Sequence, residues 1–192
     1  NMAYDLKNVF YLDTETTIAK TTAGAGSAQL DLSAYVDPIA RGRQKGTGLA
    51  IYKVHYSIIN SDDANVATPD PSETMAVTMS MLAGAGFGDV STGNLNFAAG
   101  STSMNASNQL VVSAASYYGP GIPGSSTAQP EQYVMPSKDV PYVIVRDNVC
   151  LVYVVDTGAQ ATDDYLLSVR LECAQVPLDQ ATLNQLLRTQ TV

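Results

Sequence analysis

The sequence predicts an all-β protein, an antiparallel β-sandwich with a short helix near its C-terminal end. Apolar and polar residues alternate with a period of two along most of the chain, and the helical period of 3.6 is nearly absent. Gly, Pro, Asn and Ser separate the alternating runs, a spacing typical of sandwiches and barrels. No helical pattern alternates with the strands, so a parallel α/β sheet is not expected.

Alternating runs predict most of the strands directly. Every second side chain in such a run is apolar, so one face of the strand enters a core while the other meets water. Runs with this pattern are Phe10 to Ile18, Leu30 to Val36, Ala50 to Ile58, Met75 to Met81 and Leu110 to Tyr118, with a weaker run near Leu95 and Phe97. Gly-rich stretches such as Ala23–Ser27 and Arg41–Gly48 are interpreted as loops.

The most apolar part of the chain predicts a hairpin and a return strand. Pro141–Val145 and Val149–Val155 flank Arg146-Asp147-Asn148, and Asp and Asn favour turns, so we expect a tight hairpin. Both arms are apolar on both faces, which is typical of a strand that is covered on both sides. Tyr165–Val176 then alternates again and supplies the last predicted strand.

A short helix is expected after that strand. Asp179 can cap its first turn, and Leu183, Leu186 and Leu187 share one face at spacings of three and four residues. No internal repeat is visible, and no polar linker is long enough to divide the chain. Residues 1–192 are therefore expected to form a single β-sandwich domain.

Composition restricts the classes of function. The chain has 192 residues, a net charge of −8 and only 15% charged residues, below the roughly 25% that soluble domains average. Residues 54–137 contain no Lys or Arg, and no charged side chain lies between Asp89 and Glu131. Loops of this kind can pack against another subunit with little desolvation cost. No apolar stretch of about 18 residues is present, so no transmembrane segment is expected.

Residues that could carry chemistry are few. His55 is the only histidine, no G-x-S-x-G motif is present, and His-rich metal sites are excluded, so His55 is interpreted as a half-exposed strand residue. Asn60–Asn65 offers oxygen ligands but lacks the EF-hand pattern, so we interpret it as a solvated acidic turn. We expect no catalytic residue, no metal and no cofactor, and hence no enzyme.

The two cysteines, Cys150 and Cys173, both lie in strand-like runs. Two cysteines are too few for a disulfide framework. Unpaired cysteine behaves as a small apolar residue, so two buried free thiols are expected. A single cross-strand disulfide is the alternative.

One basic cluster stands out in this acidic chain. Arg41-Gly42-Arg43-Gln44-Lys45 holds three of the ten basic residues. Three charges give only a weak, salt-sensitive contact with nucleic acid, so a contact with a neighbouring subunit is favoured. The candidate interface residues are Arg41, Arg43, Lys45, Tyr117, Tyr118, Ile122, Leu183, Leu186 and Leu187.

These features together resemble the single jelly-roll coat proteins of small icosahedral viruses. The resemblance is architectural, covers the whole chain and is strongest over Pro141–Val176. It implies a jelly roll of about eight strands and a viral capsid subunit that forms a shell with copies of itself and with other capsid proteins. It implies location in the virion, or otherwise outside the cell. Many such proteins carry a basic N-terminal arm, but Asn1–Lys20 contains only Lys7 and Lys20, so little direct contact with nucleic acid is expected.

Two other functions compete with this hypothesis. A carbohydrate- or receptor-binding β-sandwich, such as an adhesin or fibre tip, would act as a monomer, with Tyr117, Tyr118 and Asn60–Asn65 as ligand contacts. A β-sandwich hydrolase would need paired carboxylates, and Asp13 and Glu15 share a strand face, but a pair across a cleft must come from distant strands. The single histidine and the missing nucleophile motif disfavour the hydrolase.

Overall fold

The computed structural model describes residues 8–20, 24–37, 45–61, 76–83, 111–118, 131–155 and 163–190. Within these residues the chain forms nine strands and one helix. They are β1 Phe10–Ile18, β2 Gly24–Asp31, β3 Lys45–Asn60, β4 Ala76–Ala83, β5 Val111–Tyr118, β6 Glu131–Val134, β7 Tyr142–Ile144, β8 Asn148–Val155, β9 Tyr165–Asp179 and α2 Gln180–Thr189.

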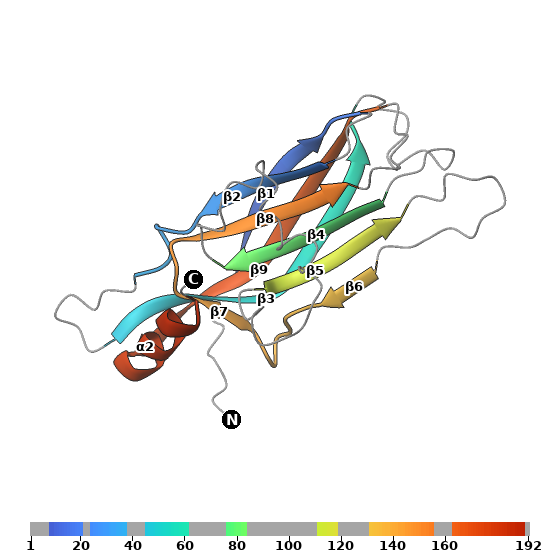
Figure 1. Ribbon diagram of the computed structural model, residues 1–192. Helices are drawn as coiled ribbons and strands as arrows, with labels where there is room; N and C mark the ends of the chain where they lie inside the picture. Colours follow the sequence, from blue (N-terminus) through green and yellow to red (C-terminus); the bar gives the residue numbers. More distant parts are fainter. Residues whose placement is uncertain are drawn as a thin grey trace.

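The strands form two antiparallel sheets that lie over one another as two layers (Figure 1). Sheet A has the order β1-β9-β3-β7, and sheet B has the order β2-β8-β4-β5-β6. Apart from β6, the first four strands pair with the last four in reverse order, as β1–β9, β2–β8, β3–β7 and β4–β5. This winding of one long hairpin into two sheets is a jelly roll. The predicted all-β sandwich with a C-terminal helix is confirmed.

The core fills the space between the two sheets. Along β1 the side chains alternate between partly buried and exposed, as the sequence pattern predicts, and Ile18 is buried. The inward positions of β9 from Tyr165 to Cys173 are all buried, and Met79 and Met81 of β4 meet them from sheet B. Both faces of β8 are largely buried, which confirms the two-sided cover predicted for this run.

The described parts of two glycine-rich stretches interpreted as loops belong to strands. β2 already begins at Gly24, and β3 begins at Lys45 and includes Gly46 and Gly48. A Cβ atom at Gly26 would overlap the ring of Tyr153, so the missing side chain makes room for an aromatic one. Glycine inside a strand marks such close approaches, and here that role outweighs its loop preference.

The third run changes face because of a β-bulge. Ile51 pairs with Cys173 and Lys53 pairs with Glu172, which leaves Tyr52 as one extra residue in β3. An extra residue exchanges the faces of all positions beyond it. Val54, Tyr56 and Ile58 point inward as predicted, whereas Ala50 lies on the opposite face, so the expected single alternation from Ala50 to Ile58 is wrong.

The predicted hairpin between Pro141 and Val155 is also wrong. β7 pairs with β3 in sheet A, while β8 pairs with β2 and β4 in sheet B. The turn at Arg146 and Asp147 therefore leads from one sheet to the other. A strand can be apolar on both faces because other parts of the chain cover each face of its sheet. This pattern alone does not show that β7 and β8 pair with each other.

Helix α2 covers the outer face of sheet A at one end. Asp179 caps it by accepting a hydrogen bond from the Thr182 amide at 2.7 Å, as predicted. Leu183 is fully buried in a second apolar cluster formed with Ala50, Val143, Val145, Val176 and Leu178. A Cβ atom at Gly46 would lie 2.8 Å from a methyl carbon of Leu183, so glycine at this position lets the helix approach the strand.

The residue after α2 closes the free edge of sheet A. The Gln190 side chain is buried, its Nε2 donates to the carbonyl of Val143 at 2.6 Å, and its Oε1 accepts from the Val145 amide at 3.0 Å. These are the backbone groups that an added strand would use on edge strand β7. One side chain thus replaces a strand partner at this edge.

The alternative of a disulfide is wrong, because Cys150 and Cys173 are both free and buried. Burial raises the pKa of the Cys173 thiol to about 12 and raises that of Cys150 as well. Thiolates form with difficulty at such sites, so these thiols are inert in the folded chain.

We predict that Gln190→Ala lowers the free energy of unfolding by about 1–3 kcal/mol, because two buried backbone groups lose their partner. Urea unfolding measures the loss, and amide hydrogen exchange at Val145 should accelerate. Gln180→Ala is the matched control, since Gln180 is exposed and its one hydrogen bond within the described part of the chain is to Asn184 on the same helix. Equal effects of the two substitutions would contradict the edge-closing role.

We also predict that stability falls above about pH 9. The Cys173 thiol ionises near its ordinary pKa in the unfolded chain but only at about pH 12 in the folded chain, so rising pH favours unfolding. Tyr142, whose pKa burial raises to about 12, acts in the same direction. Chemical denaturation between pH 7 and 11 tests this, and Cys173→Ala should flatten the decline. An unchanged slope in that variant would contradict the assignment.

Candidate subunit-contact surfaces

A shallow groove of about 590 Å³ lies on the outer face of sheet A, across β1, β9 and β3. Its polar lining comes from Tyr11, Asp13 and Glu15 of β1, Ser168, Arg170 and Glu172 of β9, and His55 and Ser57 of β3. We call it the sheet A groove. It combines carboxylates, a guanidinium, an imidazole and an aromatic ring on one exposed surface.

The strand register explains why these side chains gather. Asp13 pairs with Arg170, which pairs with His55 on the other side, so the three form one row across the sheet. The next row contains Glu15 with two serines, and the row on the other side joins Tyr11, Glu172 and Lys53. Directly opposite residues in antiparallel strands share a face, so the rows make one continuous surface.

Pairing within the groove is incomplete. His55 Nε2 lies 3.1 Å from Glu172 Oε1, and the Arg170 guanidinium lies 5.7 Å from the centre of the Tyr11 ring. No described cation forms an ion pair with Asp13 or Glu15, which are both exposed. The His55 side chain is 43% exposed, which confirms the predicted half-exposed strand histidine.

The bulge residue borders this surface. Tyr52 lies beside the row of Tyr11, Glu172 and Lys53. Partial burial, together with the Glu172 carboxylate, raises the pKa of the Tyr52 phenol. The phenol is protonated at neutral pH, as tyrosine phenols ordinarily are, and can donate a hydrogen bond.

The predicted contact residues separate into two groups. Lys45 begins β3 opposite Asp179, so it lies at the same end of the sandwich as α2 and its leucines. Tyr117 and the backbone of Tyr118 pair with Val77 and Ala76, at the opposite end. Tyr117 is half-buried, and burial raises its pKa. Arg41, Arg43, Ile122 and the side chains of Lys45 and Tyr118 lie outside the described residues.

The helix leucines are used within the chain. Leu183 is fully buried, and Leu186 and Leu187 are partly buried against the same cluster. Leu183 has no surface left for another subunit, so its role is to dock α2 on β3. Only the exposed parts of Leu186 and Leu187 remain available for contact.

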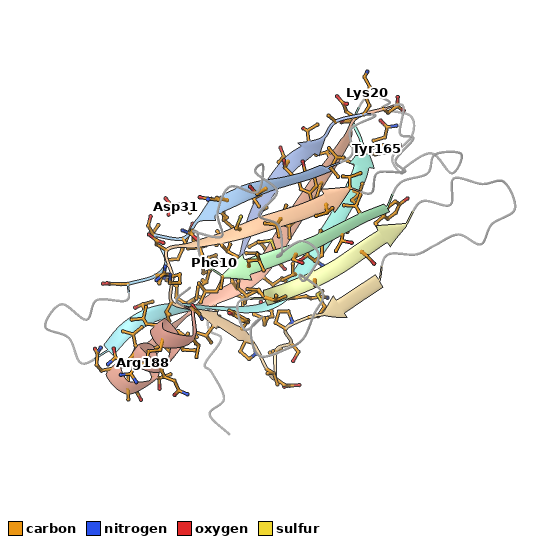
Figure 2. The ribbon with its side chains drawn as sticks, in the orientation of Figure 1. Phe10, Lys20, Asp31, Tyr165 and Arg188 are labelled. Carbon is orange, nitrogen blue, oxygen red and sulfur yellow. The ribbon has the colours of Figure 1, made fainter. Side chains whose placement is uncertain are left out.

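One end of the sandwich carries two neighbouring carboxylates. Ile18, Tyr165 and Asn60 are register partners there, and Lys20 and Tyr165 lie at this end while Arg188 lies at the other (Figure 2). We call it the acidic end. Asp163 and Asp164 precede β9 at this end.

Hydrogen bonds tie two segments together at the acidic end. Asn60 Nδ2 donates to Asp163 at 2.7 Å, and the Ser61 amide donates to the Asp164 carbonyl at 2.9 Å. The predicted acidic turn therefore starts beside Asp163, although Asp62 to Asn65 lie outside the described residues. Among the described residues no group of three side chains could hold a metal ion.

The sheet A groove was not found in the sequence. His55 stands out in the sequence as the single histidine, and Asp13 and Glu15 as carboxylates on one strand face. Nothing in the alternating pattern indicates that β9 lies between β1 and β3. The available signal was the charged residues at outward positions of each strand. These residues indicate a site only when the order of the strands in the sheet is known.

The comparisons with known proteins are sparse. No family model and no curated protein matches the sequence. A chain of turnip yellow mosaic virus superimposes with a TM-score of 0.35 and 8% identity, covering 89% of this chain and 93% of that chain. A chain of Desmodium yellow mottle tymovirus gives 0.31 and 11%, covering 91% and 90%. These weak likenesses to virus structures do not establish a shared fold. The jelly-roll fold of this chain follows from its strand pairing.

The helical part of the described chain is small. Its helix has ten residues, and no described helix has the length and apolar character to cross a membrane.

We predict that Leu183→Ala destabilises the isolated subunit by about 2–5 kcal/mol, because a fully buried leucine leaves a cavity when it is truncated. Thermal or urea unfolding of dilute protein measures the loss. Leu186→Ala should cost clearly less, since that side chain is only partly buried. Equal stability of Leu183→Ala and wild type would show that α2 does not dock as described.

Proposed function

We propose that this chain is a non-catalytic structural subunit that assembles with copies of itself, as a viral capsid protein does in the virion. The observation that carries the proposal is the jelly-roll winding, with β1–β9, β2–β8, β3–β7 and β4–β5 paired in reverse order. Jelly rolls occur in viral capsids and also in lectins, so the fold alone leaves more than one function open.

The distribution of charge supports the structural role over the others. Only 15% of residues are charged, and no charged side chain occurs between Asp89 and Glu131. Large permanent interfaces are depleted of charge, so such a stretch suits contact between subunits. The net charge of −8 disfavours direct contact with a genome.

A second candidate function is a carbohydrate- or receptor-binding module, and the sheet A groove is the observation that favours it. Asp13 and Glu15 offer acceptors without an ion-pair partner among the described residues, and Arg170 and His55 offer donors beside them. Sugar hydroxyls donate and accept at once, so such a mixed set of groups suits a polyhydroxyl ligand. This candidate places the ligand on sheet A rather than at Tyr117 and Tyr118.

Size-exclusion chromatography with light scattering, at low and high salt, tests the structural role. We expect closed particles or rings of many 20.3 kDa copies, visible by negative-stain microscopy. Assembly should change with salt, because contacts between exposed charges are screened.

A 20.3 kDa monomer at every concentration and salt would contradict the structural role. A glycan array with the monomer would then test the second candidate. Binding that Asp13→Asn abolishes would support the binding module.

A further inference from the structure

The two carboxylates of β1 lack the partners that the rest of the groove has. Glu172 is held by His55 at 3.1 Å, and Arg170, the register partner of Asp13, lies over the Tyr11 ring and forms no ion pair with Asp13 or Glu15. Glu15 is flanked across the sheet only by the neutral Ser168 and Ser57. The part of the groove nearest edge strand β1 is therefore a negatively charged surface whose carboxylates have no ion-paired counter-charge among the described residues.

The sequence contains one cluster of positive charge that could supply it. Arg41, Arg43 and Lys45 are three of the ten basic residues, and they lie within five positions. The remaining cation near the groove, Lys53, is exposed in the row of Tyr11 and Glu172 rather than beside Glu15.

This basic segment cannot reach Glu15 of its own chain. The segment between Asp37 and Lys45 is closed by the Asp37–Thr47 bridge, with both hydrogen bonds at 3.0 Å. Eight peptide units anchored at both ends extend at most about 13 Å from that bridge, and an arginine side chain adds about 7 Å. The row of Glu15 crosses β9 at Ser168, nine residues from Pro177, the register partner of Thr47, or about 30 Å away.

We propose that the sheet A groove receives the Arg41–Lys45 segment of a second copy of this chain. Arginine pairs with carboxylates through two parallel hydrogen bonds, so Arg41 and Arg43 match Asp13 and Glu15 in chemistry as well as in charge. The contact rests on the proposed self-assembly, for which it names the two complementary surfaces.

The two surfaces differ, and this determines the kind of assembly. A contact between unlike patches leaves one groove and one basic segment free after every addition. It therefore continues from copy to copy and ends only when a ring or shell closes. A contact between identical patches would stop at a dimer.

Reciprocal charge exchange tests the contact. The groove variant carries Asp13→Arg and Glu15→Arg, the segment variant carries Arg41→Glu and Arg43→Glu, and a third chain carries all four changes. We expect the groove variant alone, or the segment variant alone, to raise the protein concentration needed for assembly at least tenfold. The combined variant should return to within about threefold of wild type, because the charges are complementary again.

Two controls separate the contact from general effects. Asp139→Arg removes an exposed carboxylate outside the groove and should assemble like wild type. Circular dichroism and thermal unfolding show whether each variant keeps its fold. Mixing a Glu15→Cys chain with an Arg43→Cys chain should give a disulfide-linked heterodimer. Neither chain should form a disulfide-linked dimer on its own, since both native thiols are buried.

Each outcome decides between the two proposals. Assembly of wild type with no effect of either charge variant, or no heterodimer in the mixture, overturns this contact and leaves self-assembly standing. Failure of wild type to assemble overturns both. Normal assembly of the groove variant together with loss of glycan binding assigns the groove to a carbohydrate and also overturns the contact.

Discussion

One extra residue, Tyr52 in β3, sets the relation between the core, the helix and the outer surface. Before the bulge, Gly48 and Ala50 face outward and Leu49 and Ile51 face the core. After it, Lys53, His55 and Ser57 face outward while the apolar positions still point inward. A strand of 16 residues keeps one unbroken alternation only if every second residue along it is apolar. In this sequence the apolar positions shift by one residue, from odd numbers before Tyr52 to even numbers after it. The bulge absorbs that difference, as bulges do where a strand must redirect its side chains.

The outer face of sheet A is therefore divided between an apolar and a polar half. The apolar half is covered by α2, which fits because Gly46 carries no side chain. The polar half forms the groove. The two edges of this sheet are protected by different means, since Gln190 occupies the free backbone of β7 while acidic side chains line β1. Identical β1 strands would set like charges opposite one another, which disfavours edge-to-edge pairing between copies.

Much of the fold could be predicted because side-chain alternation is a local signal. The strands around Phe10, Met79 and Leu171 and the cap at Asp179 were identified from spacing alone, and each is confirmed. Long-range packing was not visible in the same way. Gly26 and Gly46 look like loop residues until Tyr153 and Leu183 are placed against them, and the turn at Asp147 looks like a hairpin until its strands are assigned to separate sheets. The groove was missed for this reason as well, because it requires three strands that are distant in the sequence.

The position of β9 has a consequence for the order of folding. It comes last of the nine strands in the sequence, yet it lies between β1 and β3 and is the strand that joins them. Its register partners lie between 105 residues away, as for Asn60 and Tyr165, and 163 residues away, as for Phe10 and Cys173. Pairing over such distances is slow, and synthesis delivers the chain from its N-terminal side. Sheet A therefore cannot close before Tyr165 and the rest of β9 have been synthesised, and until then β1 and β3 expose unpaired edges.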